Sequence, residues 1–342
     1  MKDLIKKLSG LQGISGFEYR ISEEIKNLFL PYSDEVKSDA LGNIIAVKHS
    51  KNPQAKKLLI EAHTDEIGLM VKNIDENGFL TFVNVGGVDP RILPAMEVTV
   101  HGKKDLKGII GAKPPHIQPD GEDKKAVKME DMSIDTGLPY EEVKNLVSVG
   151  DSVTFATFAK ELSDGQLTGK SLDDRASIAV LAEVMKNIKN VPVSADIYAV
   201  AAVQEEVGGF GAMTAGYSIY PDFAIAIDVC HGITPDNSYC AYEAGGGTVI
   251  TLGPNIHPVM FEKLKKTAEK YNIKFQIEVE GGNTGTDAWQ FQVIREGIPT
   301  GLLSIPLKYM HTPVETIHSD DVTATIDLVT AFIKELSEEE EF

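Results

Sequence analysis

Two neighbouring carboxylates, Glu205 and Glu206, end a run of small and β-branched apolar residues in the stretch AVAAVQEEVGGFGA. Charged side chains are seldom fully buried unless they are paired or bound to a metal. Three glycines among the next five residues indicate a backbone that turns closely around a bound group. An exposed strand end also tolerates two acids, so the pair indicates a site only if other residues join it.

Further candidate ligands stand where other predicted strands end. In open α/β sheets, ligands bind beyond the carboxyl ends of the strands, so side chains at those ends meet at one edge. Taken singly, each candidate has an ordinary structural explanation, because Asp residues before a helix cap its amides and a His-x-Asp sequence is commonly a satisfied pair. The candidates are His63 and Asp65 after LLIEA, Asp173 and Asp174 before a helix, Asp228 after FAIAI and His311 after GLLSIPLKYM.

Together these residues match the needs of two divalent metal ions. Zn²⁺ and Co²⁺ accept imidazole nitrogen and carboxylate oxygen. Two such ions about 3.5–4 Å apart need one shared carboxylate, plus one His and one carboxylate each. We assign His63 and Asp228 to one ion, with one Asp as the bridge. Glu206 and His311 then complete the second ion.

Two carboxylates are left for roles other than direct ligation. Asp65 follows His63 by two residues on an extended chain, so it can point the same way and hold the imidazole through its other nitrogen. Adjacent residues of an extended segment face opposite ways, so Glu205 and Glu206 should not bind the same ion. Glu205 therefore suits a proton shuttle, first general base to water and then general acid to the leaving group.

The elements that must position these residues have an α/β pattern. Before about Glu66, two amphipathic helical patterns precede the strands NIIAVK and KLLIEAHTD. The apolar run 58–60 indicates a strand buried on both faces, as in a parallel sheet. From about Thr168 onward, strands and helices alternate up to a final helix in DDVTATIDLVTAFIKELS.

The middle region has a different pattern. Between about Ile67 and Leu167 the segments are short, rich in Val, Thr and Phe, and separated by turn residues. This pattern predicts a small β-barrel or sandwich. We therefore expect one discontinuous α/β domain, residues 1–66 and 168–342, with residues 67–167 inserted into it as a β-barrel.

Composition excludes several classes of partner. The chain has 342 residues and a net charge of −18, which would repel nucleic acid and anionic membranes. No run of about eighteen apolar residues could span a membrane, and the N-terminus lacks a signal-peptide core. Two cysteines, Cys230 and Cys240, cannot form a disulfide framework, so we expect reduced thiols in a cytoplasmic protein.

The ordered motifs AHTDEIG, GKSLDDR, QEEVGGFGA, AIDV, GTDA and YMHTPVETI resemble a known family. They are similar to the co-catalytic metallo-aminopeptidases called tetrahedral, deblocking or glutamyl aminopeptidases (metallopeptidase family forty-two), and the likeness covers nearly the whole chain. It implies a doubly wound mixed sheet flanked by helices, with the inserted barrel used in dimerisation or assembly. It also implies homo-oligomers, from dimers up to tetrahedral dodecamers.

The resemblance also implies roles for individual residues. Asp173 would be the bridging ligand, followed by a cis peptide bond to Asp174, and Glu205 would be the catalytic acid/base. The sequence departs from many relatives where Gly209 to Gly211 replaces Leu-Arg-Gly. The arginine is missing here, so a preference for acidic side chains does not follow from the likeness.

We therefore expect an aminopeptidase with two divalent metal ions, Zn²⁺ or Co²⁺, per subunit. It would remove N-terminal residues from peptides with a free N-terminus, by attack of a water that bridges the ions, with Glu205 as general acid/base. One alternative is a metal-dependent amidohydrolase of acylated amino acids, which would use the same site with another pocket. A second is an endoglucanase, but two adjacent carboxylates are poorly placed to flank a glycosidic bond. A third is a non-enzymatic assembly protein on a peptidase fold.

Overall fold

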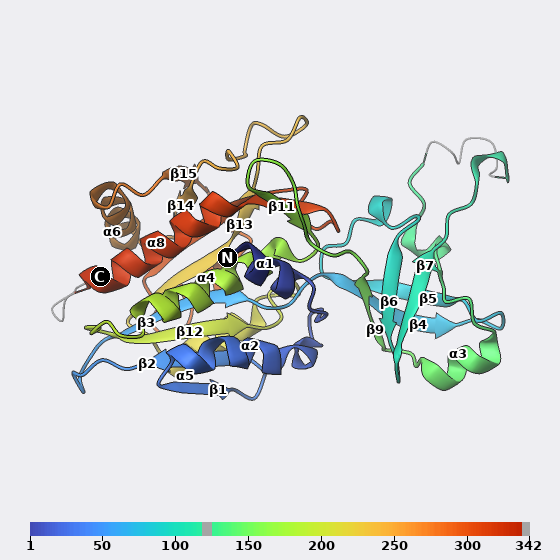
Figure 1. The fold of residues 1–342 in the computed structure, drawn as a ribbon, viewed down its shortest axis with the longest axis horizontal. Coiled ribbons are helices and arrows are strands. Elements are labelled where there is room, and N and C mark those ends of the chain that lie inside the picture. Colours follow the sequence, from blue (N-terminus) through green and yellow to red (C-terminus); the bar gives the residue numbers. More distant parts are fainter. Residues whose placement is uncertain (118–124, 337–342) are drawn as a thin grey trace.

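The computed structural model describes residues 1–117 and 125–336. It contains a large mixed sheet flanked by helices and, to one side, a closed six-stranded antiparallel β-barrel (Figure 1). The expected fold class, a doubly wound mixed sheet with a small barrel, is confirmed. The helices are α1 Lys2–Ser9, α2 Ser22–Phe29, α3 Tyr140–Leu146, α4 Leu172–Ile188, α5 Phe210–Ile219, α6 Pro258–Lys270, α7 Ala288–Phe291 and α8 Ser319–Glu335.

The large sheet has parallel strands at its centre and antiparallel strands at its edges. Strands β12, β3, β13 and β16 are parallel neighbours, and β2 and β17 pair with them in the opposite direction. Strand β14 pairs with β16, and β15 pairs with β14. In spatial order the strands are β1 Glu35–Ser38, β2 Ile44–Lys48, β12 Asp196–Ala202, β3 Lys57–His63, β13 Phe223–His231, β16 Thr300–Lys308, β17 Glu315–His318, β11 Gln166–Gly169 and β10 Lys160–Glu161, with β14 Thr248–Leu252 and β15 Phe275–Val279 branching from β16.

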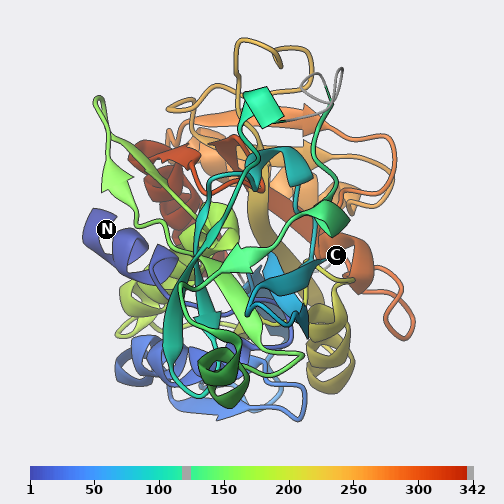
Figure 2. The same ribbon diagram turned by 90° about the vertical axis from the view of Figure 1, so that its right-hand side faces the viewer.

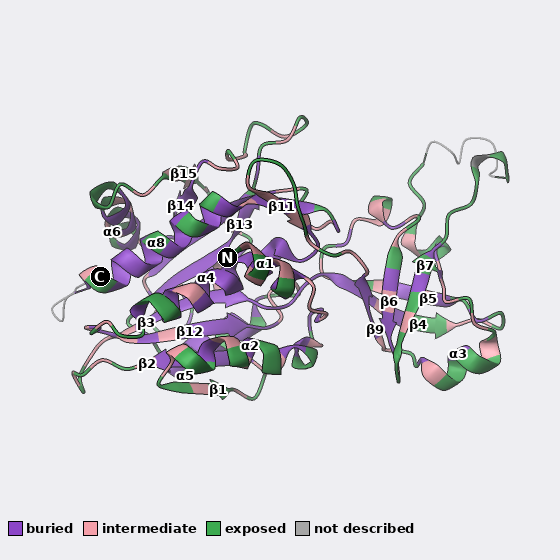
Figure 3. Ribbon diagram, viewed as in Figure 1, coloured by how far each residue is buried: buried purple, intermediate pink, exposed green. Residues whose placement is uncertain are grey.

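The parallel centre is buried on both faces, as the apolar runs predict. Leu58, Leu59 and Ile60 of β3 are fully buried, and Figure 3 shows β3 and β13 buried along most of their length. Helices α4 and α8 pack against each other and against β3, β13 and β16. Helices α5 and α7 pack against each other and against β12, β13 and β16. These two helix pairs supply the apolar surfaces that a parallel sheet needs.

The register of the central strands places candidate ligands side by side. Ala226 of β13 pairs with Glu61 of β3 in parallel. His63 and Asp228 each lie two residues further along their own strands, so the two side chains come level at the same carboxyl edge. The sheet alone therefore brings together the two residues that we assigned to one ion.

The barrel forms a second core, separate from that of the large sheet. Its strands close in the order β4 Gly68–Ile74, β5 Leu80–Val85, β8 Ile134–Asp135, β7 Asp105–Ile110, β6 Glu97–His101 and β9 Ser152–Phe155. Figure 2 shows the barrel in front of the large sheet. All six strands lie within the predicted insertion 67–167, whereas β10 and β11 pair at the edge of the large sheet. The division of the chain into two domains stays a prediction.

A buried ion network ties the start of α4 to the segment that leads into the barrel. The Lys170 ammonium donates to Glu66 Oε2 at 2.6 Å, and Glu66 Oε1 accepts from the backbone N–H of Gly13. The fully buried Arg175 guanidinium donates to the carbonyl oxygen of Thr64 at 2.6 Å. Because Thr64 lies between His63 and Asp65, this network fixes the end of β3 relative to the start of α4.

Within the described residues, no helix has both the length and the apolar character needed to cross a membrane. Both cysteines are free, with Cys230 buried and Cys240 exposed.

Candidate metal centre

The residues singled out in the sequence converge on one cavity of about 580 Å³ at the carboxyl edge of the sheet. Strand ends, the start of α4 and two loops each contribute to it. His63 and Asp65 are buried and do not line the cavity themselves. The candidate residues that line the cavity directly are Asp173, Glu205, Glu206, Asp228 and His311.

Asp173 lies between the two histidines. Its Oδ1 is 3.1 Å from His63 Nε2, and its Oδ2 is 3.5 Å from His311 Nε2. The peptide bond to Asp174 is cis, as the resemblance implies. One carboxylate that reaches two imidazoles with different oxygens has the geometry that a ligand shared by two cations requires.

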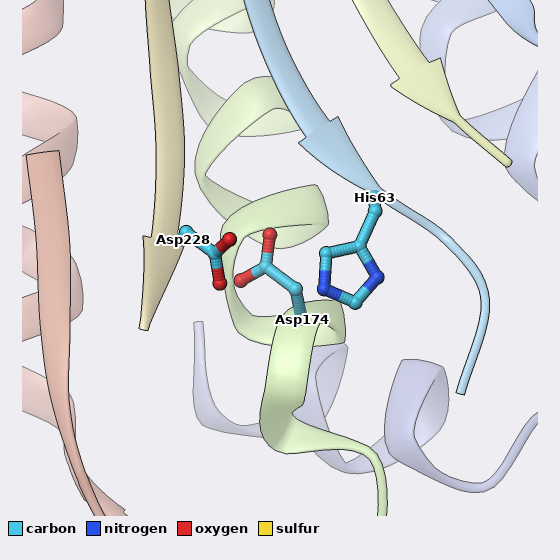
Figure 4. A group of neighbouring side chains, drawn as sticks. All are labelled: His63, Asp174 and Asp228. Carbon is cyan, nitrogen blue, oxygen red and sulfur yellow. The ribbon is translucent and has the colours of Figure 1, made fainter. Parts of the chain in front are cut away.

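Asp174 belongs to the site as well, although the sequence pattern alone favoured a helix cap for it. One ligand atom from each of His63, Asp174 and Asp228 lies within 4.8 Å of the others, and Figure 4 shows the Asp174 carboxylate between the other two side chains. A second such group consists of His63, Asp173 and Glu206. Two overlapping groups that share His63 indicate adjacent binding positions.

Asp65 organises the turn that carries the two glutamates. Its Oδ1 accepts the backbone N–H of Glu205 at 3.1 Å, and its Oδ2 accepts the backbone N–H of Glu206 at 3.2 Å. Ser15 Oγ donates to the same Oδ2 at 2.6 Å, and His63 Nδ1 is 3.5 Å from Oδ1. One buried carboxylate thus orients both the imidazole and the loop with the acid pair.

Glu205 and Glu206 lie in a turn after β12, so the expectation of an extended segment was wrong. The strand ends at Ala202, and Gln204 has a φ of +60°, which reverses the chain. The Gly208 N–H donates to the Glu205 carbonyl and closes the turn. The glutamates nevertheless diverge, because Glu205 Oε2 is 4.0 Å from His63 Nε2 while Glu206 Oε2 is 3.4 Å from His311 Nε2.

The centre brings together several buried carboxylates that have no basic side chain beside them. Burial, together with the nearby Asp228, raises the pKa of Glu205 to about 9, although His63 opposes this. Burial also raises the pKa values of the Glu206 and Asp228 carboxyls well above their ordinary range. Within residues 1–117 and 125–336, no Lys or Arg forms an ion pair with any carboxylate of the two ligand groups. Such carboxylates stay ionised at neutral pH only where cations offset their charge, and otherwise they take up protons.

The residues fit divalent cations by donor chemistry and by their unmet hydrogen bonds. Both oxygens of Asp174 are buried without a hydrogen-bond partner. Burial opposes the charged imidazole of His63, but Asp173 and Asp65 outweigh it and raise the pKa of that ring. Mixed nitrogen and oxygen donors of this kind suit borderline ions such as Zn²⁺.

Glu315 is a residue of the site that the sequence reasoning did not single out. Its Oε2 accepts the backbone N–H of Asp173 at 3.1 Å, and its Oε1 accepts the backbone N–H of His311 at 3.1 Å. Burial raises its pKa well above the ordinary range. The signal was its position four residues after His311, within the HTPVETI motif. Glu315 thereby fixes Asp173 and the His311 loop to each other.

An α/β sheet that gathers imidazoles and buried carboxylates at its carboxyl edge is typical of metal-dependent hydrolases. The family model described as M42 glutamyl aminopeptidase matches residues 42–328. The lysyl aminopeptidase of Pyrococcus furiosus is 37% identical over 340 residues, which cover 98% of this chain and 97% of that protein. The chain therefore belongs to the M42 glutamyl aminopeptidase family. As a member it is an aminopeptidase, a hydrolase that acts on peptides.

Solved structures agree with this assignment. The Pyrococcus horikoshii TET1 peptidase, described as assembling into a tetrahedron or a large octahedral shell, has a TM-score of 0.87 and 34% identity, covering 98% of this chain and 99% of that one. A Thermotoga maritima protein described as an endoglucanase has a TM-score of 0.79 and 32% identity, covering 97% of this chain and 96% of that one. Similar proteins of this fold are therefore described both as peptidases and as endoglucanases.

Proposed function

We propose that the chain is an aminopeptidase whose centre holds two divalent metal ions, Zn²⁺ or Co²⁺. The observation that supports this most is Asp173, whose two oxygens face His63 and His311 separately. His63 and Asp228 would hold one ion. Glu206 and His311 would hold the other, with Asp173 shared between them.

The bound ions would polarise the scissile carbonyl and activate the water that attacks it. Glu205 lines the cavity beside this centre and takes the proton from that water, then returns it to the departing amine. Asp65 acts on Glu205 through its backbone N–H, so it positions the acid/base rather than touching substrate. Glu315 restrains the Asp173 and His311 backbones in the same indirect way.

The cavity also supports recognition of a free N-terminus. Its wall near the centre is rich in carboxylates, which attract the α-ammonium group of a peptide and align the first peptide bond for cleavage. The names of similar proteins do not show which N-terminal side chain is preferred, because the family is described as glutamyl and the Pyrococcus furiosus relative as lysyl. Peptides with a free N-terminus are therefore the proposed substrates.

We extend the proposal to assembly. Residues 1–66 and 168–342 form the catalytic domain, and residues 67–167 form the barrel used in subunit contacts. The tetrahedral and octahedral assemblies described for the Pyrococcus horikoshii TET1 peptidase support a homo-oligomer. Light scattering on the purified chain should give a mass several times that of one subunit, whereas a monomer would contradict this part. A cytoplasmic location rests on the cysteines and the sequence pattern and stays a prediction.

Two other activities use the same residues less well. In an endoglucanase with paired carboxylates, His63 and His311 would have no task, although they lie against Glu205 and Glu206. The chain also has one Trp, few for a cleft that stacks sugars. An amidohydrolase of acylated amino acids would keep the centre but would have to accept a blocked amine.

A substrate panel distinguishes these activities. We expect the metal-reconstituted protein to cleave aminoacyl-p-nitroanilides with a free amine, and to lose that activity with a chelator. N-acetylated versions should be cleaved at least about 100-fold more slowly, because the cavity would lose an ionic contact. Faster cleavage of the acetylated set would favour the amidohydrolase. Hydrolysis of soluble cellulose without anilide cleavage would overturn the aminopeptidase proposal.

A further inference from the structure

The cavity extends beyond the metal centre to two more glutamates. Glu278 lies on β15 and Glu280 follows that strand, and both line the same 580 Å³ cavity as Glu205 and Asp228. No Lys or Arg lines it among the residues that the structure describes. Outside the metal centre, these two glutamates are the carboxylates of the wall, and His231 also lines it. The far part of the cavity is therefore acidic as well.

Strand register places Glu278 on the sheet face that carries Asp228. Asp228 pairs with Ser304, and Ser304 pairs with Val249 on β14. Thr251 lies two residues after Val249 and pairs with Glu278. Paired residues, and residues two apart on a strand, share a face, so all five side chains point to one side of the sheet.

This arrangement sets the reach that a substrate side chain needs. Three strand spacings separate β13 from β15, which is roughly 14 Å between backbones. A lysine side chain spans about 6 Å from Cα to Nζ, so its ammonium can lie well away from the scissile bond, whereas a short side chain cannot reach the far part of the cavity.

The Glu278 carboxylate is fixed in place but lacks a cationic partner. Its Oε2 accepts a hydrogen bond from Thr251 Oγ1 at 2.7 Å. Neither Glu278 nor Glu280 forms an ion pair with a Lys or Arg in residues 1–117 and 125–336. Burial raises the pKa of Glu278, the Thr251 hydrogen bond lowers it, and the neighbouring Glu280 raises it further. Glu280 is the weaker candidate partner for a ligand, because it is held less firmly: its Oε1 accepts the Gly282 N–H at 3.3 Å, a longer contact than the 2.7 Å bond that holds Glu278.

We infer that Glu278 determines specificity at the first substrate position and selects peptides with an N-terminal Lys or Arg. This inference rests on the proposed aminopeptidase function and adds the side chain that the cavity prefers. A cationic side chain would pair with Glu278 in the part-buried end of the cavity. An N-terminal Glu or Asp would meet only like charge there, despite the glutamyl description of the family.

The test compares kcat/KM for Lys-, Arg-, Leu- and Glu-p-nitroanilide on the metal-reconstituted protein. We expect the native chain to favour Lys and Arg over Leu, and Leu over Glu. Glu278→Gln should lower kcat/KM for Lys and Arg by about 10- to 100-fold, mainly through KM, since it removes one member of a desolvated charge pair. The Leu substrate should change by less than about threefold, and Glu262→Gln on the exposed face of α6 should change none of the four.

A charge reversal keeps the inference testable if Glu278→Gln folds poorly. Glu278→Lys should raise the ratio of Glu to Lys cleavage, and a ratio is independent of the fraction of folded enzyme. Equal losses on all four substrates, with no change of that ratio in Glu278→Lys, would overturn the role of Glu278 and leave the aminopeptidase function standing. Absence of cleavage of every anilide by the native, metal-loaded chain would overturn both.

Discussion

Glu205→Gln should abolish turnover and leave metal content unchanged. Gln keeps the size of the side chain but cannot accept and return a proton, so kcat should fall by about 10²- to 10⁴-fold. The Glu205 carboxylate lines the cavity, lies 4.0 Å from His63 and stands outside both groups of candidate ligands. The measurement is kcat on an aminoacyl-anilide together with metal per subunit by elemental analysis.

Two further variants distinguish loss of the acid/base from loss of metal. Glu206→Gln should also inactivate the enzyme, but it should lose metal, because Glu206 belongs to a ligand group with His63 and Asp173. Glu262→Gln on the exposed face of α6 is the matched control and should keep both activity and metal. A Glu205→Gln enzyme that turns over near the native rate would remove Glu205 from the proposed mechanism.

Asp173→Asn should weaken binding of both ions at once. Asp173 faces His63 with one oxygen and His311 with the other, and the amide removes both the negative charge and one of the two oxygens. Loss of an outer hydrogen-bond partner already costs about 10- to 100-fold in metal affinity, and loss of a direct ligand should cost at least that much. Competition with a chromophoric chelator measures the affinity of each ion.

The matched control for Asp173→Asn is Asp131→Asn, an exposed carboxylate on the barrel side of the chain. It should bind both ions as the native chain does. Thermal melting without metal should confirm that Asp173→Asn folds, since removing one of several buried like charges should not unfold the apo protein. Loss of only one ion from Asp173→Asn would assign Asp173 to a single site and leave the bridging role to Asp174.

The sequence could place the residues on strand ends because the central strands are simple. Leu58 to Ile60 form an apolar run that indicates a strand buried on both faces. The parallel register then places His63 level with Asp228. Nothing more than strand period and strand ends was needed for those two ligands. The same logic located Glu205 and Glu206 at the edge of the sheet.

Local backbone geometry was harder to predict. Gln204 has a positive φ although it is not a glycine, so nothing in the sequence indicated the turn there. The segment was therefore predicted as extended, whereas it forms a tight turn. Short strands such as β14 and β17 lie in segments with little periodicity and were not predicted. The sequence DAWQFQVIRE predicts a longer helix than the one present, Ala288–Phe291, which is followed by turns up to Gly297, whose φ is positive.

Glu315, a buried carboxylate that acts through backbone amides, was the largest omission. Its sequence context is ordinary, since it follows a proline in the segment after His311. Its importance comes from long-range contacts, because it accepts the N–H of Asp173, which is 142 residues away in the chain. Such contacts depend on the complete fold, which one sequence does not disclose.

Metal titration of the chelator-stripped protein tests the central claim most directly. Zn²⁺ or Co²⁺ is added in steps while bound metal per subunit and aminoacyl-anilide turnover are measured on the same samples. The account predicts saturation at two ions per subunit, with turnover returning as the sites fill. Full turnover by the stripped protein would contradict it. So would a native chain that binds no metal at any concentration in the titration.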